Sequence, residues 1–298
     1  MRKFLFELPA LGIAVPSFGL ALLLACVSAL ALAVWRARRE RIDPDEVMGL
    51  AAWLMTGGFL GARALYVVAH PETIRGLADA LRFWQGGIVY YGCLIGGLIG
   101  SILYWRQTRF PFRAMADVVA PTLALGSAIG RVGCFLNGCC YGAVCHAPWA
   151  VTFPAGSPPW ARHVQAGLIP LDAVRSLPVH PAQLYAVADG LLLLALLTWY
   201  FPRRRRDGEV MALLMVTYPL TRSLIEALRD DEPHAYLGLT LSQAISVVVF
   251  VAGLATWAWL LRQPARRHAD RAVHSGRQPV KPRGVVVPEL PLVGKRSA

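Results

Sequence analysis

The sequence predicts an all-α polytopic membrane protein with seven transmembrane helices, an external N-terminus and a cytoplasmic C-terminus. Of its 298 residues, 56% are hydrophobic and only 16% are charged, and the mean hydropathy is +0.47. The apolar residues gather in blocks of about 20, the length of helix that crosses the hydrocarbon core of a bilayer. This composition excludes an ordinary soluble globular domain, in which about a quarter of the residues are charged.

Seven apolar segments are long enough to cross the membrane. A backbone in lipid must satisfy its own hydrogen bonds, so each segment is expected to be helical. No alternating pattern of about ten residues indicates a β-barrel. The predicted spans are 15–35, 47–69, 86–105, 118–137, 182–201, 210–228 and 237–261.

Basic residues set the predicted orientation. They follow the first, third, fifth and seventh spans and are scarce on the other side, so the positive-inside rule places the C-terminus in the cytoplasm. The net charge of +12 then reflects topology rather than nucleic-acid binding. The residues are Arg36, Arg38, Arg39, Arg41, Arg106, Arg109, Arg113, Arg203, Arg204, Arg205 and Arg206, with further Lys and Arg beyond the seventh span.

The chain divides into a membrane domain, 1–262, and a basic tail, 263–298. The tail is rich in Pro, Arg and Gly and poor in large apolar residues, which is typical of disorder. Between the fourth and fifth spans, residues 138–181 form the one long loop, and we expect a small external cap there.

Five charged residues lie inside the predicted spans, where an unpaired charge is expensive. In the predicted topology the three arginines share a depth of roughly 9 Å below the external surface, at 1.5 Å per residue. One hypothesis is that they converge on the phosphate of a single anionic lipid. The alternative is structural: Arg222 pairs with Glu226, Arg63 pairs with Asp189, and Arg131 reaches the interface. The five residues are Arg63, Arg131, Asp189, Arg222 and Glu226.

The external end of the fourth span, residues 130–142, reads GRVGCFLNGCCYG. Its glycines expose backbone N–H groups beside Arg131 and Asn137, a composition suited to cradling a phosphate. Elsewhere, several glycines in the second and third spans favour close helix packing.

From residue 10 to 262 the chain resembles the bacterial prolipoprotein diacylglyceryl transferases. The resemblance rests on several segments in the same order, and the motifs GRxGxFxNG and HPxQLY are the most specific of them. The segments are 58–66 (GFLGARALY), 83–96 (FWQGGIVYYGCLIG), 117–121, 130–142, 180–185 (HPAQLY) and 222–226 with Arg229.

The resemblance implies a multi-pass transferase of the bacterial inner membrane that acts in lipoprotein biosynthesis. Such an enzyme moves the diacylglyceryl group of phosphatidylglycerol to the lipobox cysteine thiol of a preprolipoprotein, the first step of lipoprotein maturation. Glycerol phosphate leaves, so positive groups must stabilise its charge. The implied partners are phosphatidylglycerol, preprolipoprotein signal peptides and membrane lipid, with no nucleic acid, no metal and no cofactor, and we expect a monomer.

The resemblance also suggests roles for individual residues. Arg131 matches the family's signature arginine and is expected to bind the lipid phosphate, while Arg222, oriented by Glu226, is expected beside the leaving phosphate. The expected catalytic residues are Arg131, Arg222, Glu226 and Tyr91, and the expected substrate-binding residues are Arg131, Arg63, Asn137, Gly142, Gln183 and Tyr185.

The chain departs from the family pattern where the acceptor thiol would be activated. Tyr91 stands where the family usually has a histidine, and a phenol with an ordinary pKa near 10 is a poor base at neutral pH. Cys134 and Cys139 replace an asparagine and a glutamate, and Phe18 replaces a tyrosine. The phosphate-binding part of the pattern is intact.

Four of the six cysteines lie at the external end of the fourth span. Disulfides are one interpretation, pairing Cys139 or Cys140 with Cys134 or Cys145. Others are unpaired packing residues, a thiol-redox relay, or a zinc site formed by Cys134, Cys139, Cys145 and His146. The alternative functions are therefore a membrane thiol-redox or metal-binding protein, or a catalytically silent lipid-binding paralogue on the same scaffold.

Overall fold

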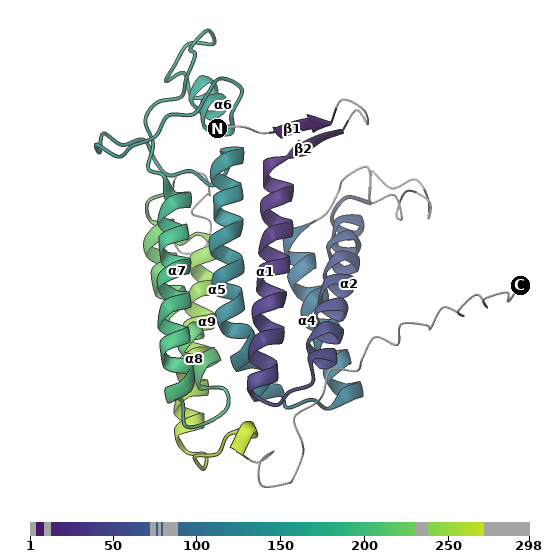
Figure 1. Cartoon of the computed structure of the whole chain (residues 1–298). Coiled ribbons are helices and arrows are strands. Elements are labelled where there is room, and N and C mark those ends of the chain that lie inside the picture. Colours follow the sequence, from purple (N-terminus) through teal and green to yellow (C-terminus); the bar gives the residue numbers. More distant parts are fainter. Residues whose placement is uncertain are drawn as a thin grey trace, which may run out of the picture.

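The computed structural model describes residues 4–8, 13–71, 76, 79, 89–229 and 238–270. Long helices lie side by side in a bundle, with a small hairpin and a looped segment beyond one end, here called the cap end (Figure 1). The long helices are α1 (Ser17–Arg39), α2 (Pro44–Ala69), α4 (Tyr90–Thr108), α5 (Phe112–Asn137), α7 (Ala182–Tyr200), α8 (Glu209–Glu226) and α9 (Leu241–Leu261).

Within the described part of the chain, five helical segments are long and apolar enough to cross a membrane: α1, α2, α5, α9 and Ala182–Arg203, which joins α7 to the 3-10 helix η3 (Phe201–Arg203). This confirms a predominantly helical membrane protein. The shorter α4 and α8, of 19 and 18 residues, occupy the other two predicted positions. The predicted starts of the third and seventh spans, at residues 86 and 237, and the tail beyond 270 lie outside the described residues.

A short β-hairpin that the sequence did not predict precedes the helices of this membrane protein. Strands β1 (Phe4–Leu8) and β2 (Ile13–Pro16) form an antiparallel hairpin that leads directly into α1. Each strand has at most five residues, too short for an alternating pattern to be distinguished from the apolar run that follows.

Glycines bring α2 and α4 into backbone contact, as their positions predicted. A Cβ added at Gly61 would overlap the carbonyl oxygen of Gly92 and lie 2.7 Å from the Cα of Gly96. Gly57 and Gly100 make similar approaches along the same pair of helices. By contrast, α5 packs mainly on α1 and α7, and α8 packs mainly on α9.

A buried charge cluster joins three helices at the end of the bundle opposite the cap. The side chain of Arg204 is 0% exposed and contacts Glu40, at the end of α1, and Asp117 of α5, the latter at 3.1 Å. Asp117 also accepts hydrogen bonds from the backbone N–H groups of Gly208 and Val210 at 2.7 and 2.8 Å. Because Asp117 satisfies free donors at the N-terminus of α8, it fixes α8 against α5. Arg204, expected only as a topology signal, is a structural residue.

Residues 138–181 form a cap with a small core of its own. Phe153 and Val179 are both 0% exposed and pack with Tyr141. The short helix α6 (Pro158–Gln165) belongs to this segment, and a pair of backbone hydrogen bonds joins Val151 to Val179. The cap continues directly from α5 and leads directly into α7, so it covers the ends of both helices (Figure 1).

Candidate active site

A cavity of about 340 Å³ lies between α4, α5, α7 and α8. Its lining is mainly apolar, with Asp189 as the one charged side chain, and the hydroxyl of Thr221 hydrogen-bonds the Asp189 carboxyl group. The lining residues are Leu94, Leu123, Ala124, Ser127, Asp189, Gly190, Leu193, Leu214 and Tyr218. Such a lining suits the glycerol and upper acyl region of a lipid better than its charged headgroup.

Four candidate residues lie one helical turn beyond this cavity, toward the cap end. Residues three or four positions apart share a helix face. Tyr91 precedes Leu94 by three residues on α4, and Arg131 follows Ser127 by four on α5. In the same way, Arg222 follows Tyr218 on α8, and Tyr185 precedes Asp189 on α7. By helix register, these four candidate residues therefore share faces of four helices with the lining of one cavity.

At the end of α8, two arginines contact one carboxylate. The side chain of Glu226 is 1% exposed, forms an ion pair with Arg222, and lies 3.4 Å from the guanidinium of Arg229. A second oxygen of Glu226 is buried without a hydrogen bond among the described residues. Two guanidinium groups on one carboxylate leave a net positive charge at this point. Arg229 was not among the expected site residues, although its position three residues after Glu226 indicated that the two side chains could meet.

Arg131 is half-buried on α5, and the described part of the chain offers its guanidinium no ion pair and no hydrogen bond. A partly buried guanidinium without an internal partner is available to an anionic ligand. Asn137, the last residue of α5, is also half-buried and hydrogen-bonds the thiol of Cys139. Arg131 and Asn137 thus both lie near the cap end of α5.

The structure does not bring Arg63 into this group. Arg63 belongs to α2, which packs on α4 and α1, and its guanidinium donates to the backbone oxygen of Asp79 at 2.5 Å and lies 5.2 Å from the ring centre of Tyr66. The alternative pair with Asp189 is not formed either, because Asp189 lies beside Thr221. Of the three arginines expected to converge, Arg131 and Arg222 lie by helix register beside the same cavity, and Arg63 does not.

Three of the expected substrate-binding residues hold the cap onto the helices. A Cβ added at Gly142 would lie 2.6 Å from the Cβ of His180 and 2.8 Å from the backbone oxygen of Leu228, so only glycine fits between α7 and α8. Gln183 is 0% exposed and donates to the backbone oxygen of Cys139 at 2.8 Å. The Tyr185 hydroxyl accepts from the Trp149 indole at 2.7 Å.

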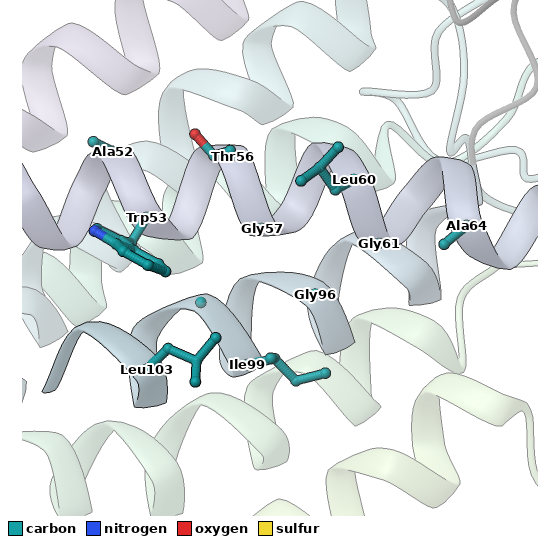
Figure 2. Close-up of a pocket in the computed structure, with 11 residues that line it drawn as sticks. Ala52, Trp53, Thr56, Gly57, Leu60, Gly61, Ala64, Gly96, Ile99 and Leu103 are labelled. Atoms are coloured by element: carbon teal, nitrogen blue, oxygen red, sulfur yellow. The ribbon is translucent and has the colours of Figure 1, made fainter. Parts of the chain in front are cut away.

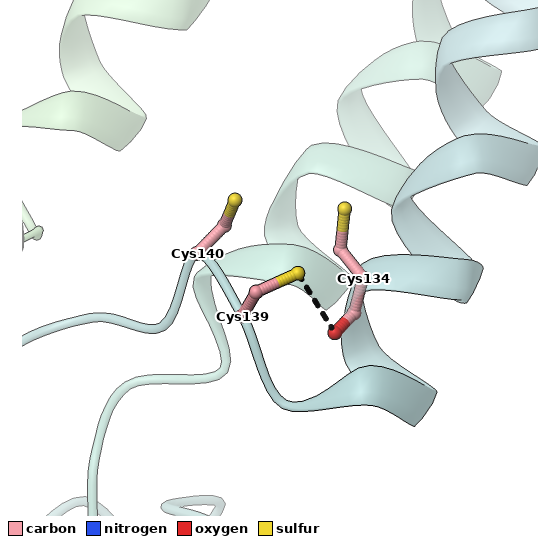
Figure 3. Close-up of side chains that lie close together, drawn as sticks. All are labelled: Cys134, Cys139 and Cys140. Atoms are coloured by element: carbon pink, nitrogen blue, oxygen red, sulfur yellow. Dashed lines mark hydrogen bonds between the residues drawn. The ribbon is translucent and has the colours of Figure 1, made fainter. Parts of the chain in front are cut away.

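Three thiols gather where α5 meets the cap. The sulfur atoms of Cys134, Cys139 and Cys140 all lie within 4.8 Å of one another (Figure 3). All six cysteines of the chain are described, and none forms a disulfide. The zinc alternative considered from the sequence shares only Cys134 and Cys139 with this group, whose third member is Cys140. Hydrogen bonds from the thiols of Cys134 and Cys140 lower the pKa of the Cys139 thiol.

A second cavity, of about 510 Å³, lies along the α2–α4 pair and holds none of the candidate residues (Figure 2). Trp53, Leu60 and Leu103 line it together with the packing glycines, and no charged side chain does. Such a groove fits hydrocarbon rather than a phosphate.

The sequence of the chain matches a known protein family and several known proteins. Residues 3–259 match the profile of the prolipoprotein diacylglyceryl transferases. A phosphatidylglycerol–prolipoprotein diacylglyceryl transferase of Clostridium tetani is 31% identical over 254 residues, 85% of this chain and 96% of its own length. Proteins of the same name from Nostoc sp. and Paracidovorax citrulli are 34% and 35% identical, over 82% and 76% of this chain and 84% and 79% of theirs. The chain belongs to the prolipoprotein diacylglyceryl transferase family.

Proposed function

We propose that this protein transfers the diacylglyceryl group of phosphatidylglycerol to the cysteine thiol of a preprolipoprotein. The observation that carries the proposal is the register of Arg131 and Arg222, which lie on separate helices one turn beyond a mainly apolar cavity of about 340 Å³. The names of the relatives supply the two substrates.

The reaction needs positive charge where the phosphate leaves. The thiol sulfur forms a bond to the glyceryl carbon, the bond from that carbon to the phosphate oxygen breaks, and its electron pair leaves with glycerol phosphate. Arg131, which has no described internal partner, binds the phosphate through its planar fork of donors. Arg222 is held in place by the buried Glu226 and stabilises the charge that grows on the leaving oxygen.

The remaining expected residues have supporting roles in this proposal. Asn137 donates to the phosphate at the end of α5, and Tyr91 hydrogen-bonds a substrate at the start of α4. Gly142, Gln183 and Tyr185 act by holding the cap over the site. Arg63, on the neighbouring α2, guides the anionic headgroup toward the cavity.

Seven spans, an external cap and a cytoplasmic C-terminus in the inner membrane complete the proposal, with a monomer as the working unit. Arginine–tryptophan pairs at the end opposite the cap support this orientation, because tryptophan favours the membrane interface and arginine its cytoplasmic side. The pairs are Arg39 with Trp35, Arg109 with Trp105, Arg113 with Trp259 and Arg203 with Trp199, with the cation 3.8 to 5.5 Å from the ring centre.

Complementation tests the proposal directly. Expression of this chain should rescue a bacterial strain depleted of its own diacylglyceryl transferase, and purified protein should lipidate a lipobox peptide in vesicles that contain phosphatidylglycerol. Arg131→Ala should abolish both effects. Arg162→Ala, an exposed arginine on the cap helix α6, is the matched control and should retain them. Failure of the wild-type chain in both assays, with the protein present in the membrane, contradicts the proposal and favours a silent paralogue.

A further inference from the structure

The thiol cluster has the dimensions of a metal site. A tetrahedral Zn²⁺ ion with Zn–S bonds of about 2.3 Å holds its sulfur ligands roughly 3.8 Å apart. The sulfurs of Cys134, Cys139 and Cys140 already lie within 4.8 Å of one another, so small side-chain rotations bring them to this spacing. Figure 3 shows the three side chains approaching from the last turn of α5 and from the loop that follows it.

The backbone around the cluster is arranged to bring the thiols together. Gly138 and Cys140 both adopt left-handed conformations, with φ of 81° and 57°, and together they fold the chain back over the end of α5. This backbone region is unfavourable for a non-glycine residue such as Cys140, and such conformations concentrate at functional sites. The buried Gln183 then fixes the loop by its bond to the Cys139 carbonyl.

The cluster supplies three ligands rather than four. Structural zinc sites are closed by four protein ligands, whereas catalytic sites use three and leave one position open. Thiolates are soft ligands that select Zn²⁺ and Cu⁺ among the available ions, and Zn²⁺ adds no redox chemistry. All three cysteines are half-buried, so the open position is accessible to a substrate.

The position of the cluster connects it to the lipid site. Cys134 follows Arg131 by three residues on α5, so the two side chains share a helix face with a rise between them of roughly 4.5 Å. Zinc bound to three thiolates carries a net charge of −1. The guanidinium of Arg131, which has no charged partner in the described part of the chain, balances that charge.

We propose that Cys134, Cys139 and Cys140 bind a zinc ion whose fourth position binds and activates the acceptor thiol of the preprolipoprotein. This inference rests on the proposed transferase function. Coordination releases the thiol proton to water and keeps the sulfur as a thiolate at neutral pH. The zinc-bound sulfur then attacks the glyceryl carbon, the carbon–oxygen bond to phosphate breaks, and the electron pair leaves with glycerol phosphate. The thioether product has no negative charge on sulfur, so it dissociates from the metal.

Metal content tests the site independently of activity. The full-length protein, purified in detergent with a reductant, should contain one zinc ion per chain by elemental mass spectrometry. Cys134→Ser, Cys139→Ser and Cys140→Ser should each lower zinc affinity more than about tenfold, since even changes beyond the direct ligands cost that much. Cys26→Ala, at an exposed position on α1, is the control and should keep the metal. Size-exclusion profiles establish that each variant is folded.

Cobalt substitution tests the open position. The Co²⁺-loaded protein should show thiolate-to-metal charge-transfer absorption, which intensifies when a lipobox peptide with a free cysteine is added. A peptide with serine in place of that cysteine should cause no change. An unchanged spectrum with the cysteine peptide overturns the acceptor role.

Activity measurements separate this inference from the proposed function. Removal of zinc by a chelator should abolish lipid transfer, and added Zn²⁺ should restore it. A metal-free protein that transfers lipid at the full rate, or one in which two of the three cysteines are joined by a disulfide in its active form, overturns the zinc proposal and leaves the transferase standing. A zinc-loaded protein that binds the peptide thiol yet never transfers lipid overturns the transferase proposal, and the acceptor role with it.

Discussion

The carboxylate of Glu226 forms an ion pair with the guanidinium of Arg222, one helical turn away on α8, and is almost fully buried. A buried carboxylate of this kind needs a cation, and here two arginines share it, because Arg229 approaches the same oxygen at 3.4 Å. The arrangement restricts the rotamers of Arg222 and leaves one excess positive charge beside the cavity. In the proposed reaction, Glu226 therefore positions the cation that would stabilise the leaving phosphate.

Glu226→Gln should lower the rate of lipid transfer by about 100-fold, since small displacements of a positioned group have effects of that size. Glu209→Gln is the matched control, because Glu209 is a similarly buried carboxylate paired with Arg206 at 3.2 Å, at the opposite end of the bundle. Both variants should lower the melting temperature, but only the first should slow transfer per folded molecule. Equal effects on transfer would assign Glu226 a structural role alone.

Arg204→Met should destabilise the protein strongly. Removal of one partner from a buried ion cluster costs about 3 to 5 kcal/mol, because the charges of Glu40 and Asp117 are left uncompensated. Arg205→Met is the control, since Arg205 is exposed and contributes its backbone N–H to Glu209. Thermal unfolding in detergent measures the difference, and equal melting temperatures for the two variants would contradict the structural role of Arg204.

The sequence predicted the helices well and the contacts between distant segments poorly. The apolar run predicted a fifth span at 182–201, and α7 covers Ala182–Tyr200. The link between Asp117 and Arg204 was not predicted, because Arg204 is one of four consecutive arginines and nothing local distinguishes the buried member. Such a distinction depends on the packing of α5 against α8.

In the candidate site, too, local spacing was predictable and the grouping of side chains in space was not. Helix periodicity was enough to place Arg222 beside Glu226, since residues four apart share a face. The sequence left several combinations of the four external cysteines and His146 open, because proximity along the chain does not show which sulfur atoms lie together. The structure groups Cys134, Cys139 and Cys140. The left-handed backbone at Cys140 turns its thiol toward Cys134, and this conformation is not evident from a non-glycine residue.

Gly61→Ala should weaken the contact between α2 and α4. The added methyl group would lie 2.7 Å from the Cα of Gly96, so the helices must move apart. Gly126→Ala is the control, because the nearest atom to its added Cβ is at an ordinary 3.8 Å. Overpacking typically costs about 1 to 3 kcal/mol, so the first variant should melt at a lower temperature than the second. A melting temperature for Gly61→Ala at or above that of Gly126→Ala would contradict the close helix approach.

Gly142→Ala should uncouple the cap from the membrane helices. Its Cβ would overlap with His180 and with the backbone of Leu228, which precedes Arg229, so transfer should fall even where the bundle remains folded. Gly167→Ala tests whether strain in the cap alone has this effect, since Gly167 has a φ of 68° but no atom within 4 Å of an added Cβ. That control should lower stability by about 1 kcal/mol and leave lipid transfer intact. Transfer by Gly142→Ala at the wild-type rate would remove the cap contact from the mechanism.

Tyr91→Phe separates two roles for the phenol at the start of α4. If the zinc ion proposed at the three cysteines activates the acceptor thiol, the Tyr91 hydroxyl contributes only one hydrogen bond to a substrate. Such a bond is worth about 0.5 to 1.5 kcal/mol. The variant should therefore transfer lipid about tenfold more slowly at most, with unchanged zinc content. Tyr218→Phe, which removes a hydroxyl from the lining of the same cavity, is the matched comparison. Complete loss of transfer in Tyr91→Phe would identify the phenol as the base that activates the thiol, and an unchanged rate would exclude it from the reaction.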